Sequence, residues 1–241
     1  MNKGLLIRVA IDSTSGGWNG PCDDSGSFCY VPMGSSDDLT ERYDRAYHPY
    51  HRSVSAFLPN SAHPLARWPR QLPRWGHFDP DFEHLSYGDA GQRATRIRTQ
   101  LAEGGFIVFY AGLRSIYSGE LCYSIIGFYA VDGVLAGPSV CRADWHRNAH
   151  TRGGGCTDEN TIVVFARPGE SGRLRHHIPI GSYRRGAYRV QRDILREWGG
   201  LDVSDGYIQR SVFLPAFTDG ASFLRWFRLQ RPEFLSLNNP K

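Results

Sequence analysis

The 241-residue sequence has almost no lysine, no closely spaced cysteines and no long apolar run. Because a membrane-spanning helix needs about 20 apolar residues, we expect no transmembrane segment. The start, MNKGLLIRVAID, becomes polar too soon for a signal peptide, so a cytoplasmic protein is expected. Five scattered cysteines without a CxxC pair argue against a disulfide framework and a cysteine-only zinc site, and they predict free thiols.

The basic residues are almost all arginine, since Lys3 and Lys241 are the two lysines. Arginine binds phosphates and guanine edges through a planar fork, although GC-rich coding produces the same bias. Residues 1–89 carry 8 basic and 11 acidic side chains, whereas residues 90–241 carry 20 and 13. The later part of the chain is therefore positive, as a polyanionic partner requires.

The distribution of short apolar runs predicts an α+β fold. Runs of strand length occur at 5–11, 27–33, 106–111, 121–133 (with a bend at Gly127) and 160–166. Apolar periodicity and capping residues predict helices from Asp89 to Gly104, from Arg184 to Trp198, and over 219–230. We expect a single domain over residues 1–241, with a central mixed, largely antiparallel sheet flanked by about three helices. Residues 34–88 form a long irregular segment, rich in proline and tryptophan, of the kind found in lids and binding walls.

Four arginines line one side of the predicted helix 184–198, because spacings of 4, 3 and 4 residues align them. Such a stripe can follow a phosphate backbone. The alternative is a solvated face with local pairs such as Arg189 with Asp193. The stripe consists of Arg185, Arg189, Arg192 and Arg196.

Polar residues alternate in the segment GHFDPDFEHLSYGD (76–89). In an extended chain His77, Asp79 and Asp81 point to the same side. One histidine and two carboxylates suit a divalent metal or acid–base chemistry. The structural alternative is a turn at Asp79-Pro80 and a helix cap at Asp89.

A second polar segment, CRADWHRNAHTRGGGC (141–156), supplies a candidate base. His150 titrates near neutral pH and has Asn148 and Arg152 as neighbours that can orient it and bind an anion. In a helix, His146 and His150 would form a metal-binding pair instead, and a histidine with a purely structural role is the third reading. Cys22 and Cys156 lie in glycine-rich loops, where a thiolate can act as nucleophile.

The loop GGWNG (16–20) follows the first predicted strand. It lacks the GxGxxG or GxxxxGK[ST] spacing of nucleotide-binding loops. Glycine permits close approach of a ligand, Trp18 offers a stacking face, and Asn19 offers a donor and an acceptor for a base edge. A tight turn filled by a core tryptophan explains the same residues.

Taken together, these segments resemble the nucleotide modification associated domain family, third type. The resemblance covers nearly the whole chain and rests on GGWNGP, YVP, HFDPDFEHLSYGD, NAHTR (148–152), SGRLRHHIPIGSYRRGAYRV (171–190) and WGGLDVSDGYIQRS (198–211). These stand-alone proteins are linked to DNA base hypermodification and are associated with phages and mobile defence islands. The resemblance assigns no catalytic residue, so the role predicted for each residue rests on the chemistry of its side chain.

What the resemblance implies is an enzyme that acts on a modified base within DNA. The narrower expectation is hydration of the nitrile of 7-cyano-7-deazaguanine in DNA to the amide. The alternatives are a non-catalytic reader that flips and binds a modified base, as PUA-like and EVE-like modules do, and a scaffold protein. Expected partners are DNA carrying a modified base and other proteins of a DNA modification system. No association with a membrane is expected.

The predicted site has three groups of residues. No cofactor is expected, unless a divalent metal binds at His77, Asp79 and Asp81. The catalytic candidates are His150, Asp79, Asp81 and Asp12, and the substrate-binding candidates are Trp18, Asn19, Asn148 and Tyr87. The DNA-binding candidates are Arg152, Arg185, Arg189, Arg192 and Arg196.

Overall fold

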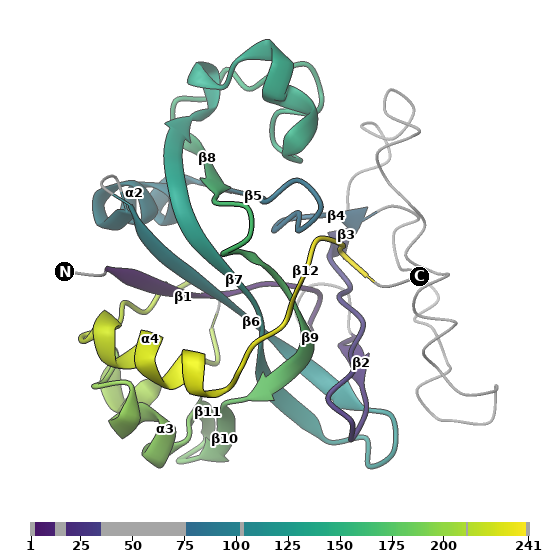
Figure 1. The fold of residues 1–241 in the computed structure, drawn as a ribbon, viewed down its shortest axis with the longest axis vertical. Coiled ribbons are helices and arrows are strands. Elements are labelled where there is room, and N and C mark those ends of the chain that lie inside the picture. The colour runs from purple at the N-terminus through teal and green to yellow at the C-terminus, as the bar shows by residue number, and fades with distance from the viewer. Residues whose placement is uncertain (1–2, 13–17, 35–75, 102–103, 211, 240–241) are drawn as a thin grey trace.

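A curved eight-stranded sheet forms the centre of the protein (Figure 1). The computed structural model describes residues 3–12, 18–34, 76–101, 104–210 and 212–239. Helix α2 (Gly91–Leu101) packs on one face of the sheet, and α4 (Gly220–Leu229) packs on the other. The α+β class is therefore confirmed. Most of the irregular segment 34–88 lies outside the described residues.

The sheet is mixed and largely antiparallel, as predicted. Its main path runs through β1 (Gly4–Arg8), β6 (Gly105–Ser115), β7 (Leu121–Ala136), β8 (Thr161–Ala166) and β5 (Ser86–Ala90). Strands β1 and β2 (Gly20–Cys22) run parallel to β6. Strand β9 (Gly172–Pro179) pairs antiparallel with β7, and β12 (Phe234–Leu235) pairs antiparallel with β9. The expected bend in β7 coincides with a register shift between Ile125 and Gly127.

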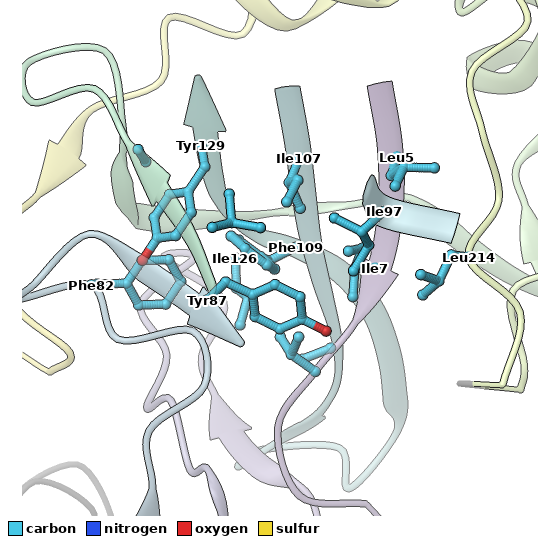
Figure 2. Packing of buried hydrophobic residues seen from close by; sticks show 14 of the residues in the cluster. Leu5, Ile7, Phe82, Tyr87, Ile97, Ile107, Phe109, Ile126, Tyr129 and Leu214 are labelled. Atoms are coloured by element: carbon cyan, nitrogen blue, oxygen red, sulfur yellow. The ribbon is translucent and has the colours of Figure 1, made fainter. Parts of the chain in front are cut away.

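Strict alternation along β6 divides the core into two clusters. Ile107 and Phe109 face the α2 side, whereas Val108 and Tyr110 face the α4 side. Successive side chains of a strand point to opposite faces, so a continuous apolar run is buried on both. Figure 2 shows the α2-side cluster, in which Phe109 packs among the side chains of β1, β5, β7 and α2.

Both of these helices lie where apolar periodicity predicted a helix. Helix α2 buries Ala94, Ile97 and Leu101 on one face. Helix α4 starts after Asp219, whose carboxylate accepts a hydrogen bond from the Ser222 amide at 3.0 Å. That bond satisfies an amide that has no partner within the helix.

The helix predicted over 184–198 is wrong for its first half. Strands β10 (Gly181–Arg184) and β11 (Ala187–Val190) form a hairpin there, and α3 starts only at Arg192 and ends at Glu197. Arg185 and Gly186 have φ of 52° and 74°, values typical of a two-residue hairpin turn. The stacked tyrosines Tyr123 and Tyr188 fix the hairpin to β7, with ring centroids 4.3 Å apart.

The strand predicted over 27–33 is also mostly absent. Only its last residue belongs to a strand, β3 (Met33–Gly34), which pairs with β4 (Gly76–His77). Three short 3₁₀ helices complete the described elements: η3 (Gly137–Ser139), η4 (Arg142–Arg147) and η5 (Ser204–Gly206). Among the described helices, none combines the length and apolarity needed to span a bilayer.

Candidate functional site

Three residues from two distant segments meet beside strand β5. His77 ends β4, Asp79 follows it in a bend, and His150 lies in the turn after η4. The Asp79 Oδ2 atom lies 2.9 Å from His150 Nε2 and 3.7 Å from His77 Nε2. The two imidazole rings are nearly perpendicular, at 87°, with centroids 5.0 Å apart. We call His77, Asp79 and His150 the histidine–aspartate cluster.

Backbone contacts hold the cluster in place. The Gly88 amide donates to Asp79 Oδ1 at 2.6 Å, so the other oxygen, Oδ2, is left to face the histidines. The amide of His150 donates to Asn148 Oδ1 at 2.9 Å, and Asn148 Nδ2 donates to Ser86 Oγ at 3.1 Å. Asn148 is fully buried. It therefore positions His150 and has no free surface for a substrate.

Gly88 is the residue that makes room for this arrangement. A Cβ atom at Gly88 would lie 2.2 Å from His150 Cδ2 and 2.8 Å from Asn148 Oδ1. Neither distance is sterically allowed, so the His150 ring packs directly over the β5 backbone. Gly88 was not among the predicted site residues, because β5 falls at the end of the segment 34–88, which was predicted to be irregular. A glycine inside a strand is a known signal of close approach.

The cluster combines a buried acid with two accessible bases. The Asp79 side chain is 6% exposed, whereas those of His77 and His150 are 22% and 26% exposed. Burial acts to raise the pKa of Asp79, but the hydrogen bonds and positive charge of His150 and His77 outweigh it and lower the pKa. Burial likewise acts to lower the pKa of His150, and Asp79 reverses this and raises it. The electrostatics therefore favour an ionised Asp79 with positive charge beside it.

Asp81 belongs to a neighbouring network and not to the cluster. Bends at Asp79 and Pro80 interrupt the extended chain that would have placed Asp81 beside His77. Its Oδ2 accepts from Arg152 Nη2 at 2.7 Å and lies 3.0 Å from His84 Nδ1. Asn238 Nδ2 donates to its Oδ1 at 3.0 Å. Because both oxygens are engaged, Asp81 ties loops together and is not placed to take a proton from a substrate.

Arg152 lies inside the protein, contrary to the role predicted for it. Its side chain is 5% exposed, and besides Asp81 it donates from Nε to the His146 carbonyl at 2.9 Å. A guanidinium in that position has no surface for a DNA phosphate. His146 itself is exposed and bonds to the Ala143 carbonyl, so it does not pair with His150.

Asp12 lies on the opposite side of the sheet from the cluster. Its carboxylate lies 2.9 Å from Arg8 Nη2, and the guanidinium of Arg8 covers the Tyr123 ring at 4.9 Å. Tyr123 belongs to the α4-side core, whereas Phe78 and Tyr87 belong to the α2-side core. The sheet therefore separates Asp12 from His150, and the structure does not bring these two candidates together.

Trp18 and Asn19 are both buried, and Gly16 and Gly17 of the same loop lie outside the described residues. Asn19 Nδ2 donates to the Gly112 carbonyl of β6 at 3.0 Å. This bond uses the amide as a tie between the loop and the sheet, so the structure supports the packing alternative for Asn19.

Tyr87 is part of the core in Figure 2. Its hydroxyl donates to Asp89 Oδ2 at 2.5 Å and accepts from Arg93 Nη2 at 2.9 Å. Burial raises the pKa of Tyr87 well above its ordinary value. The side chain thus links β5 to α2 and is 3% exposed in total.

The arginine stripe is divided between the hairpin and α3. Arg185 occupies the turn with a side chain that is 69% exposed, and Arg196 on α3 is 79% exposed. Arg192 is exposed on the same helix. Arg189 is 15% exposed, and its Nη1 donates to the Ser204 carbonyl at 2.8 Å. Asp205 faces Arg184, Arg185 and Arg189, so part of this positive charge is neutralised locally.

The five cysteines are free thiols, as expected. Burial raises the pKa of Cys22 to about 12, and nearby Cys122, Asp23 and Asp24 act in the same direction. A thiol with so high a pKa is a poor nucleophile at neutral pH.

Comparison with models of known protein families identifies the family of the chain. A family model described as nucleotide modification associated domain 3 matches residues 3–199. The chain belongs to the nucleotide modification associated domain 3 family. Membership gives it a role in DNA base modification. The search of curated proteins and the search of solved structures returned no match. The matched region contains the whole histidine–aspartate cluster and the arginines of β10, β11 and α3.

Proposed function

We propose that this nucleotide modification associated domain 3 protein is an enzyme acting on a modified base within DNA, with the histidine–aspartate cluster as its reaction centre. The observation that carries the proposal is a buried carboxylate held beside two histidines that solvent reaches. A reader of a modified base needs an aromatic cage and a few hydrogen bonds. An enzyme needs titratable groups that converge on one point, within about 3 Å of a reacting atom.

The narrower reaction is hydration of the nitrile of 7-cyano-7-deazaguanine in DNA to the amide. It requires an activated water that attacks the nitrile carbon and a proton for the nitrogen. The carboxylate of Asp79 orients His150, and the side chains of both histidines are partly exposed to solvent, so a water can approach them. The base has to leave the duplex to reach such a site.

The family and the surface charge support DNA as the carrier of the base. Arg185, Arg192 and Arg196 are exposed on one continuous stretch of chain, β10 to α3. Exposed arginines supply the contacts to phosphate that hold a strand while its base is extruded. DNA that carries the modified base is therefore the proposed partner.

One assay tests the function directly. Purified protein is incubated with DNA carrying 7-cyano-7-deazaguanine or other modified bases, the DNA is digested to nucleosides, and their masses are measured. A gain of one water on the nitrile nucleoside is the expected result. His150→Ala and Asp79→Asn are expected to abolish turnover, whereas His146→Ala, which changes an exposed histidine outside the cluster, keeps it.

The assay also decides between enzyme and reader. Unchanged nucleosides, together with tight and base-selective DNA binding, would support the reader and refute the enzyme. Full activity of both cluster variants would leave the enzyme in place but would remove the cluster as its reaction centre.

A further inference from the structure

We propose that His77, Asp79 and His150 bind a divalent transition-metal ion, and that this ion activates the water used in the reaction. The inference rests on the proposed function only for the use of the water. The geometry of the three side chains supports the metal site independently of that function.

The ligand atoms have the chemistry and spacing of a metal site. His77 and His150 offer imidazole nitrogens, Asp79 offers a carboxylate oxygen, and these three atoms lie within 4.8 Å of one another. Bonds of about 2.0–2.2 Å in a tetrahedral zinc site place two ligand atoms about 3.3 Å apart. The distances from Asp79 Oδ2 to the histidine nitrogens, 2.9 and 3.7 Å, fall on either side of that value. Small side-chain movements therefore suffice to admit an ion.

The surroundings of the carboxylate suit a single coordinating oxygen. The Gly88 amide occupies Asp79 Oδ1 at 2.6 Å, so Oδ2 is the atom that remains for an ion. Outer hydrogen bonds of this kind orient metal-binding carboxylates. A buried carboxylate also requires positive charge beside it, and a cation between Asp79 and the two histidines supplies that charge.

The open side of the cluster gives the ion a role. Three protein ligands leave a position for water, which is the arrangement of catalytic zinc sites. An ion with nitrogen and oxygen ligands is expected to be Zn²⁺ or a neighbouring first-row cation. A bound ion lowers the pKa of water to about 7 and so provides hydroxide at neutral pH.

The hydration step balances without an oxidant. The hydroxide oxygen forms a bond to the nitrile carbon, one carbon–nitrogen π bond breaks, and the nitrogen takes up a proton from solvent. Tautomerisation of the resulting imidic acid gives the amide. One molecule of water is consumed in total.

The test measures metal binding first and activity second. The full-length protein is stripped with a chelator and titrated with Zn²⁺ by calorimetry, and with Co²⁺ by visible absorption. We expect one ion per chain and a cobalt spectrum typical of nitrogen and oxygen ligands. His77→Ala is expected to weaken the affinity by at least about a hundredfold. His77→Gln serves as a second variant if the first is unfolded.

His84→Ala is the matched control, because His84 is a partly exposed histidine that also contacts an aspartate, Asp81, but lies outside the cluster. It is expected to bind one ion with unchanged affinity. Equal affinities of the His77 and His84 variants, or no saturable binding by the wild-type chain, would overturn the metal site.

Activity separates this inference from the proposed function. Loss of hydration in the stripped protein, with recovery on adding Zn²⁺, is the expected result. Full activity of protein shown to be metal-free would refute the role of the ion while leaving the enzyme in place. One ion bound at the cluster without any base modification would refute the enzyme while leaving the site in place.

Discussion

At the scale of single residues, a missing side chain is as important to the site as those that are present. Gly88 lies on β5 directly under the His150 ring and donates to Asp79. Any larger residue there has to displace His150, Asn148 or the strand itself. The position of one imidazole thus depends on the absence of a Cβ atom.

Gly88→Ala is therefore expected to reduce turnover by at least about tenfold and to weaken metal binding, since small displacements at a reacting centre are costly. The same variant is expected to lose about 1–3 kcal/mol of stability through overpacking. Thermal unfolding and the nucleoside mass assay measure both effects. Gly133→Ala on β7 is the control, because a Cβ there meets no atom within 4 Å. Wild-type activity of Gly88→Ala would contradict the proposed geometry.

His177 gives a prediction of pH dependence away from the cluster. Burial lowers its pKa from 6.5 to about 4, and the opposing effect of Asp23 is smaller. The unfolded chain then binds more protons than the folded chain between these values. Above about pH 6.5 His177 is neutral in both states and does not reduce the free energy of unfolding. As the pH falls from about 6.5 towards 4, protonation of the unfolded chain reduces that free energy.

The expected size of this loss is up to about 3 kcal/mol, reduced by solvent at the partly exposed ring. Urea unfolding of wild type and His177→Phe, at several values between pH 7 and 4, measures it. The variant should lose less stability across this window. Parallel pH profiles of the two proteins would show that His177 does not contribute.

At the scale of elements, the segment after β12 connects loops near the site through hydrogen bonds. After β12, two consecutive asparagines bond to segments far away in sequence, and Figure 1 shows this end of the chain approaching β3 and β4. Asn238 Oδ1 accepts from the Phe82 amide at 2.8 Å. Asn239 accepts from the Tyr30 amide and donates to the Tyr30 carbonyl, both at 2.8 Å. These residues lie beyond the matched family region, which ends at 199.

Asn238→Ala is expected to destabilise the protein by about 2–3 kcal/mol, because it leaves the buried Phe82 amide and one Asp81 oxygen without this partner. Chemical denaturation measures the loss. Asn160→Ala is the control, because Asn160 is exposed and its amide bonds locally to Asp158. A double-mutant cycle with Asp81→Asn gives the coupling energy, and additive effects would contradict the proposed contact.

At the scale of the whole molecule, positive charge and the reaction centre come from different parts of the chain. The cluster comes from β4, the bend after it and the turn after η4, whereas the exposed arginines lie on the β10–β11 turn and α3. Of the five arginines predicted to contact DNA, Arg152 is buried against Asp81, and Arg189 is partly buried and donates to the Ser204 carbonyl. The remaining three are the candidates for phosphate contact.

Joint replacement of Arg185, Arg192 and Arg196 by alanine is expected to weaken DNA binding to a similar extent for all sequences. Removing an arginine that binds a phosphate reduces the slope of log affinity against log salt by about 1. Fluorescence anisotropy at several salt concentrations measures this slope. Arg189→Ala is the control, since its guanidinium donates to Ser204 and covers Tyr207. An unchanged slope in the triple variant would exclude this surface.

Local apolar periodicity predicted four strands of the sheet and two helices, but it did not predict β5 or β9. Strands β1, β6, β7 and β8 and helices α2 and α4 lie where their apolar positions indicated. The same periodicity gave a wrong prediction for the first half of 184–198. The positions of Ala187, Val190 and Ile194 fit one long helix as well as they fit a hairpin followed by a short helix. The pairing of Tyr183 with Tyr188 and the turn at Gly186 stabilise the hairpin over the helix.

By itself, the sequence determined the α+β class, the strands β1, β6, β7 and β8, the family resemblance and the chemical groups of the site. Each of these depends on residue type or on short-range spacing. Only the tertiary structure decided which groups meet. His150 and Asp79 are separated by 71 residues, and the pairing of β5 with β8 and the chain turn after η4 bring them together. The bend at Asp79 and Pro80 turned Asp81 towards Arg152, and the sheet placed Asp12 on the other face. Such contacts depend on long-range packing, to which no local pattern is sensitive.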